Sequence, residues 1–75
     1  MSAKPIKLTR HAVERGLSQS LREEEIIRVV REGLKEPEGK TKCRYVLRTR
    51  RGTLIAVCDE DEERVIVITV TKGGD

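Results

Sequence analysis

The 75-residue chain has no Phe, no Trp and one Tyr, Tyr45. Proteins that bind single-stranded nucleic acids without sequence preference usually stack bases on aromatic rings, so this scarcity argues against a pure RNA-binding platform. The two cysteines, Cys43 and Cys58, are too few for a disulfide framework and lack zinc-ligand spacing. The longest apolar run, Val65 to Ile68, cannot span a bilayer, and no signal peptide is recognisable. We therefore expect a cytoplasmic protein without metal, cofactor or membrane attachment.

Charged residues make up 39% of the chain, Asn is absent and Gln occurs once, a drift typical of thermophile proteins. From Lys40 to Arg51 there are six basic residues and no acidic one. This basic segment favours an anionic partner such as RNA, although a solvated strand with protective charges explains it equally well. The run from Asp59 to Glu63 is entirely acidic. It lacks the spacing of a calcium loop, so we expect a solvated hairpin tip.

Two short helices are predicted in the first half of the chain. Thr9 is a typical N-cap residue, and Gly16 is expected to end the helix that follows it within two turns. A capping box over Ser20 to Glu23 starts the second helix, Gly33 is its C-cap, and Pro37 blocks any continuation. The apolar stripe of this second helix comprises Ile26, Ile27, Val30 and Leu34.

The second half has the composition of β-strands in three runs, which are Cys43 to Thr49, Thr53 to Asp59 and Arg64 to Thr71. Short polar links join them, so a three-stranded antiparallel meander is the simplest assembly. Pro5 to Leu8 adds a short edge strand, whereas Glu36 to Lys40 has the composition of a loop. The predicted fold class is α+β, with two N-terminal helices packed on the meander. A single domain is expected over residues 1–75, with frayed ends at 1–5 and 72–75.

The register of the first hairpin decides which residues face the helices. A two-residue turn at Arg51-Gly52 places Arg44 and Arg48 among the branched aliphatic residues of the expected core, which is costly. A three-residue loop, Arg50 to Gly52, shifts the pairing by one and exchanges the faces, so we prefer it. It predicts that Cys43 and Cys58 lie on opposite faces and form no disulfide. Its inner face comprises Tyr45, Leu47, Ile55, Val57, Ile66, Ile68 and Val70.

The outer face in this register combines arginines with an apolar strip. The strip comprises Val46, Leu54, Ala56, Val65 and Val67. Such a strip rarely stands bare in a monomer, so the N-terminal segment, a second copy of the chain or a protein partner is expected to cover it. This is the basis of one hypothesis, in which the chain is a non-catalytic interaction module that forms a homodimer or docks a partner.

The only histidine, His11, lies in the first turn of the first helix, with Arg15 one turn later. Unpaired amides at a helix start attract anions, and a histidine can transfer the protons needed for metal-free cleavage of RNA. Arginines can stabilise the charge that develops on the phosphorus. A helix-end histidine with no catalytic use fits the same spacing. Candidate catalytic residues are His11, Arg15 and Thr69, the last in a row with Arg48 and Leu54; candidate nucleic-acid contacts are Arg10, Arg44 and Arg48.

The segment from Thr9 to Arg15 carries the pattern Thr-x-His-Ala-x-x-Arg, and Val65 to Val70 forms a Val-Ile-Val-x-Thr-Val strand. With these features the chain resembles a family of small prokaryotic domains of unknown function that is similar to the RelE and BrnT ribonuclease toxins. The resemblance implies a RelE-like scaffold, a metal-independent endoribonuclease or RNA-binding activity, and an antitoxin-like partner. It places His11, Arg15 and Thr69 at matching positions. Such toxins often carry a basic or aromatic residue near the chain end, where this chain offers only Lys72.

Overall fold

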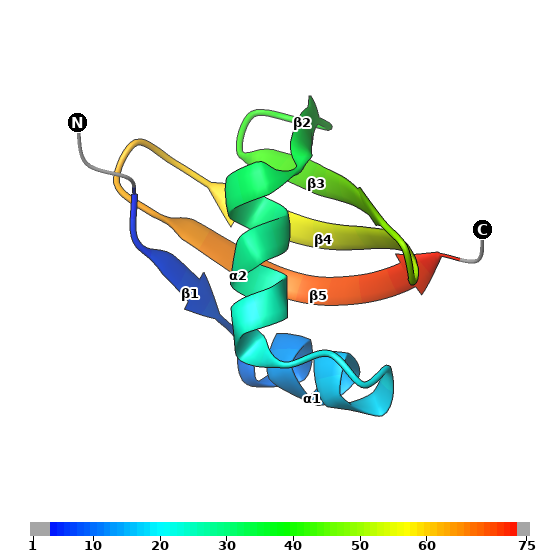
Figure 1. Ribbon diagram of the computed structural model, residues 1–75. Coiled ribbons are helices and arrows are strands. Elements are labelled where there is room, and N and C mark those ends of the chain that lie inside the picture. The colour runs from blue at the N-terminus through cyan, green and yellow to red at the C-terminus, as the bar shows by residue number, and fades with distance from the viewer. Residues whose placement is uncertain (1–3, 74–75) are drawn as a thin grey trace.

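The computed structural model describes residues 4–73 and forms one mixed five-stranded sheet with two helices. Figure 1 shows α2 lying across one face of the sheet, with α1 beside β5. The strand order in the sheet is β1-β5-β4-β3-β2. The elements in chain order are β1 (Ile6–Leu8), α1 (Arg10–Ser18), α2 (Glu23–Glu32), β2 (Leu34–Pro37), β3 (Lys42–Thr49), β4 (Gly52–Glu60) and β5 (Val65–Gly73).

The prediction of a three-stranded antiparallel meander is wrong, because β1 and β2 extend the sheet at its two edges. β1 pairs in parallel with β5, with Ile6 opposite Val65. β2 pairs antiparallel with β3, although part of it was expected to be loop. All four β2 residues are exposed, so the strand has no alternation of apolar and polar side chains. Its proline, Pro37, is tolerated because an edge strand has one side without sheet partners.

The predicted hairpin register is also wrong. Arg50 and Arg51 form a two-residue turn in which Thr49 pairs with Gly52, whose φ of 120° suits glycine. As a result, Tyr45 lies opposite Ala56. Tyr45 faces inward as predicted, but β4 presents the opposite side chains to the helices.

A β-bulge in β5 also changes which of its side chains face the helices. Val57 pairs with Thr69 whereas Cys58 pairs with Val67, so Ile68 is the extra residue. This irregularity lets both Val67 and Val70 face the core, where both are fully buried. The buried sheet residues are Cys43, Tyr45, Leu54, Ala56, Cys58, Val65, Val67 and Val70. Of these, only Tyr45 and Val70 belong to the inner face that the sequence predicted.

The predicted register was wrong because it assumed that the larger aliphatic side chains of the strands form the core. Instead, α2 packs on the face with the smaller Ala56 and Cys58, and no described element covers the other face. That open face holds Arg44 and Arg48, whose heads stay in solvent, so the cost that ruled out this alternation does not arise. The open face also carries Val46, Ile55, Val57, Ile66 and Ile68, each half-buried by its neighbours.

The first helix is capped as expected at Thr9, whose Oγ1 accepts a hydrogen bond from Ala12 N at 3.0 Å. It does not end at Gly16, however, but continues to Ser18. Gly16 is buried against α2, and a Cβ there would lie 2.7 Å from Ile26 Cδ1. Glycine at this position therefore permits close helix packing rather than helix termination.

The second helix begins two residues later than a cap at Ser20 predicts. Arg22 is its N-cap residue, and its backbone N–H donates to Glu25 Oε1 at 3.0 Å. Ser20 instead adopts a positive φ of 63° in the preceding turn. Gly33 is the C-cap, as predicted, but Leu34 lies in β2 and is 76% exposed.

The two cysteines lie directly opposite each other on β3 and β4, on the same buried face. The expectation that they point to opposite faces is therefore wrong. Both are free thiols. Burial is the main cause that raises the pKa of Cys43, and it raises that of Cys58 to about 12.

The chain ends also differ from the expected frayed ends. Lys72 and Gly73 pair with β4 as the last residues of β5, and Pro5 O accepts a hydrogen bond from Val65 N. The remainder of the predicted frayed ends, residues 1–3, 74 and 75, falls outside the described residues. Between residues 4 and 73, neither helix is long and apolar enough to cross a membrane.

Candidate functional site

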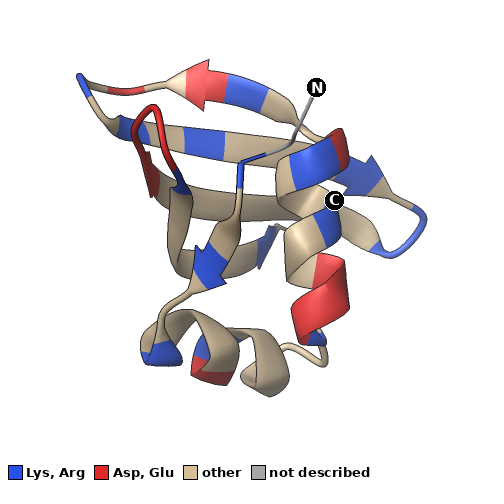
Figure 2. Ribbon diagram, turned by 90° about the vertical axis from the view of Figure 1, so that its left-hand side faces the viewer, with Lys and Arg blue, Asp and Glu red and all other residues tan. Residues whose placement is uncertain are grey.

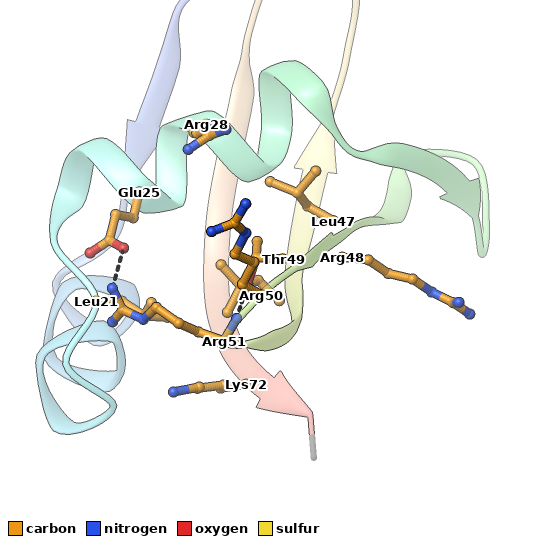
Figure 3. Close-up of a pocket in the computed structure, with 10 residues that line it drawn as sticks. Leu21, Glu25, Arg28, Leu47, Arg48, Thr49, Arg50, Arg51 and Lys72 are labelled. Carbon is orange, nitrogen blue, oxygen red and sulfur yellow. Dashed lines mark hydrogen bonds and ion pairs between the residues drawn. The ribbon is translucent and has the colours of Figure 1, made fainter. Parts of the chain in front are cut away.

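A basic cleft of about 460 Å³ lies between α2, the β3–β4 hairpin and the end of β5 (Figure 3). Leu21, Leu47 and Leu54 line it with apolar surface. Five basic residues come from three separate elements: Arg28 on α2, Arg48, Arg50 and Arg51 on the hairpin, and Lys72 on β5. The cleft therefore combines an apolar lining with positive charge.

The hairpin turn that carries Arg50 and Arg51 is held by side-chain hydrogen bonds. Thr49 Oγ1 donates to Gly52 O at 2.8 Å and accepts from Arg51 N at 3.1 Å. At the other side, Lys72 N donates to Gln19 Oε1 at 2.6 Å, which ties the end of β5 to the end of α1. The backbone that positions the basic side chains is thus fixed on both sides of the cleft.

Charge in the cleft is unbalanced. Glu25 is the only acidic residue that lines it, and its Oε2 lies 3.5 Å from Arg51 Nη1. Arg28 pairs with Glu32 at 3.1 Å. Within residues 4–73, Arg48, Arg50 and Lys72 form no ion pair. The side chain of Arg48 points away from the cleft (Figure 3), so Arg50 and Lys72 are the two cations that remain available to an anion there. Guanidinium groups suit phosphate because they donate two parallel hydrogen bonds.

Figure 2 shows how this charge is distributed over the molecule. Acidic residues gather at the start of α2 and in the loop between β4 and β5, whereas basic residues spread over β1, α2 and the strand ends. The net charge of +3 is therefore unevenly distributed along the fold.

The predicted catalytic pair lies elsewhere. His11 and Arg15 are both exposed on α1, which follows β1 and runs alongside β5. Thr9 N, at the start of this helix, donates to Val67 O at 3.1 Å. The nearby Arg10 pairs with Glu14 across one helical turn at 3.5 Å.

The predicted site residues are not brought together. Arg44 and Arg48 are on β3, two strands from β5, and neighbouring strands lie about 4.8 Å apart. α1 lies beyond β5, so His11 is separated from both arginines by the width of the intervening sheet. Thr69 is in a row with Val57 and Arg44, not with Arg48 and Leu54 as expected. Of the predicted residues, only Arg48 lines the cleft.

Arg44 is already engaged by acidic residues of the β2 side. Its Nη2 lies 2.9 Å from Glu36 Oε1 and its Nε lies 2.8 Å from Glu38 Oε2. Two carboxylates more than offset one guanidinium, so this position offers no net positive charge to a phosphate.

Sequence reasoning missed Arg28, Arg50, Arg51, Lys72 and Glu25 as members of the cleft. The basic run from Lys40 to Arg51 contained a signal for the hairpin arginines. Arg28 and Lys72 lie far from that run in sequence. The crossing of α2 over the sheet brings Arg28 near it, and the pairing of β5 with β4 brings Lys72 near it.

A second polar cluster surrounds Glu60, within the segment expected to be a solvated tip. Lys4 Nζ lies 2.7 Å from Glu60 Oε2, Lys35 Nζ lies 3.3 Å from Oε1, and the Tyr45 hydroxyl donates to Oε1. Burial alone would raise the pKa of Glu60. The hydrogen bonds from Lys4, Tyr45 and Lys35 outweigh it and lower that pKa to about 2. The cluster holds an ionised carboxylate in place and is a stabilising feature.

No candidate metal site is found in the part of the chain that the structure describes. Residues 4–73 contain no group of three or more His, Cys, Asp or Glu side chains placed to hold a metal ion. The acidic segment Asp59 to Glu63 is divided between the Glu60 cluster and a turn in which Asp61 accepts backbone hydrogen bonds from Glu63 and Arg64.

Fold and cleft together define a small α+β domain with a basic surface site. The chain belongs to the family described as domain of unknown function DUF4258, whose pattern it matches over residues 8–72. Comparisons with curated proteins and with solved structures gave no match.

Proposed function

We propose that the domain binds RNA, with the basic cleft as the main contact for the phosphate backbone. The observation that carries the proposal is the convergence of four basic side chains, from α2, the β3–β4 turn and β5, on one cavity with one carboxylate (Figure 3). RNA is preferred over other polyanions because the Thr9–Arg15 pattern is that of a domain family which is similar to the RelE and BrnT ribonuclease toxins.

The dimensions and lining of the cleft support this proposal. A cavity of about 460 Å³ has room for a nucleotide unit, and the leucine lining offers apolar surface to a sugar or base edge. The one aromatic ring, that of Tyr45, is buried in the core. Affinity therefore depends on phosphate contacts rather than on base stacking, and binding should be tolerant of sequence and sensitive to salt.

The test is a fluorescence anisotropy titration of a labelled, unstructured RNA oligonucleotide. The double variant Arg50→Ala/Lys72→Ala should weaken binding by about 10-fold or more at low salt, because two phosphate contacts are lost. The matched control Lys40→Ala/Arg64→Ala removes the same charge from exposed residues outside the cleft. Equal weakening in both variants would mean that net charge, and not the cleft, drives binding.

RNA cleavage is a separate proposal, because it rests on His11, which does not line the cleft. The imidazole is exposed near the start of a capped nine-residue helix, so a substrate phosphate can approach it. Purified protein is incubated with total RNA in EDTA beside a His11→Ala variant. Cleavage by the parent alone supports an endoribonuclease in which His11 transfers protons, whereas equal cleavage by both removes His11 from the mechanism.

A second candidate function is self-association through the open sheet face. Five branched aliphatic side chains lie there with two arginines, opposite the face that α2 covers. Isologous pairing of this face would bury them. Sedimentation velocity at increasing concentration tests it. Val57→Glu should shift a dimer to monomer, and a wild-type chain that is monomeric throughout rules the dimer out. A protein partner that docks on this face would compete with the homodimer.

A further inference from the structure

Glu25 is placed among the cleft cations in an unusual way. Its Oε1 accepts the Arg22 backbone N–H at 3.0 Å and so completes the cap of α2. Its Oε2 lies 3.5 Å from Arg51 Nη1, at the mouth of the cleft (Figure 3). One carboxylate therefore serves the helix with one oxygen and the cleft with the other.

The contact between Glu25 and Arg51 is weak by its geometry. The side chain of Arg51 is 58% exposed, and its second tether, from Nη2 to Ser20 O, measures 3.4 Å. Charge-assisted hydrogen bonds between guanidinium and carboxylate are usually about 2.7–2.9 Å long. An exposed pair of this length adds little to stability, so fold maintenance does not explain it.

We propose that Glu25 is a resident counter-ion of the cleft, which a phosphate of the bound RNA displaces from Arg51. This inference rests on the proposed RNA-binding function and names the residue that sets the affinity of the site. While Glu25 is paired with Arg51, the Arg51 guanidinium is not available to a ligand in the cleft. An RNA strand therefore engages Arg50 and Lys72 before it gains Arg51 as a further cation.

Such an arrangement makes the cleft selective for ligands with several phosphates. A single phosphate competes with a carboxylate that is tethered nearby and has no other contact to compensate. A strand contacts several cations at once, so displacement of Glu25 at Arg51 adds to contacts already formed. Mononucleotides should consequently bind far more weakly than a strand of the same bases.

The test compares Glu25→Gln with Glu24→Gln in RNA-binding titrations of the whole chain. Glutamine keeps an oxygen that can accept the Arg22 N–H, so the helix cap is preserved. Glu24 lies on the same helical turn, is exposed and does not line the cleft, so it controls for the change in net charge. Thermal melts of both variants check that the fold is intact.

We expect Glu25→Gln to bind a single-stranded RNA about 5-fold more tightly than wild type, the effect of releasing one exposed ion pair. Its salt dependence should steepen by about 0.7 in the log–log slope, which is one more phosphate contact on a single strand. In an Arg51→Ala background the difference between Glu25→Gln and Glu24→Gln should vanish.

The failures of the two proposals are distinguishable. If the wild-type chain binds RNA through the cleft but Glu25→Gln gains no more than Glu24→Gln, the counter-ion role is wrong and the RNA-binding function stands. If neither the wild-type chain nor Glu25→Gln binds RNA at low salt, both proposals fail.

Discussion

The Tyr45 hydroxyl donates a hydrogen bond to Glu60 Oε1 across neighbouring strands β3 and β4. Lys4, which precedes β1, and Lys35, which lies in β2, form ion pairs with the same carboxylate. The segment that leads into β1, the predicted edge strand, and β2, which the sequence did not predict, are thus tied to the central strands through one side chain. This cluster and the basic cleft make separate predictions.

The Glu60 cluster predicts how stability depends on pH. The pKa of Glu60 is lowered from 4.5 to about 2 in the folded chain, so its contribution is fully present above pH 4.5 and is lost as pH falls toward 2. Glu60→Gln should reduce the free energy of unfolding at pH 7 by on the order of 2 kcal/mol and flatten the acid limb. Urea unfolding between pH 2 and 7 measures both effects. Glu62→Gln, an exposed neighbour, is the control and should leave the curve unchanged.

Gly33, the C-cap of α2, is predicted to be intolerant of any side chain. A Cβ there would lie 2.5 Å from Val29 O and 2.8 Å from Val46 O, both of which are backbone atoms. Gly33→Ala should therefore destabilise the chain by about 2 kcal/mol or more. Gly39→Ala is the comparison, because the nearest atom is Lys42 Cβ at 3.9 Å. A similar melting temperature for both variants would contradict the packing at the end of α2.

The cysteine pair should be chemically silent in the folded protein. Both thiols are at least 98% buried, and burial raises the pKa of each. A thiol-reactive chromogenic disulfide should label neither residue under native conditions and both in guanidinium chloride, because the thiolate is the reactive species. Rapid labelling of one thiol without denaturant would show that the sheet opens locally.

Arg44 is predicted to make no contribution to RNA affinity, although it lies in the basic segment. Its guanidinium is already paired with Glu36 and Glu38. Arg44→Ala should change the dissociation constant less than 2-fold, whereas Arg50→Ala should weaken binding by about 3-fold to 10-fold. Anisotropy titrations in the same buffer compare the two. A larger effect of Arg44→Ala would move the binding surface to the open sheet face.

Local sequence patterns predicted elements that depend on near neighbours. The cap at Thr9, the C-cap at Gly33, the inward Tyr45 and the three long strands follow from residues close in sequence. β2 was not predicted because its four residues are all exposed and show no alternation of apolar and polar side chains. Their strand conformation depends on pairing with β3. The predicted helix end at Gly16 was wrong because this glycine serves a tertiary contact, the close approach to Ile26.

Neither the register nor the site followed from the sequence, for a shared physical reason. The positions of the arginines on β3 show which of its side chains share a face. Which face of the sheet the helices cover, however, depends on how α2 crosses the sheet. The same crossing brings Arg28 to the hairpin arginines and leaves His11 beyond β5. His11 was chosen for its chemistry, and its distance from the arginines is a property of topology.

The most direct test of the central claim is a map of amide chemical-shift changes in the labelled chain on titration with a short single-stranded RNA. Binding in the cleft predicts that the largest shifts fall on the turn at Thr49 to Gly52, on the start of α2 and on Lys72. Shifts centred on His11 to Arg15, or on the outward residues of β4 and β5, would contradict it.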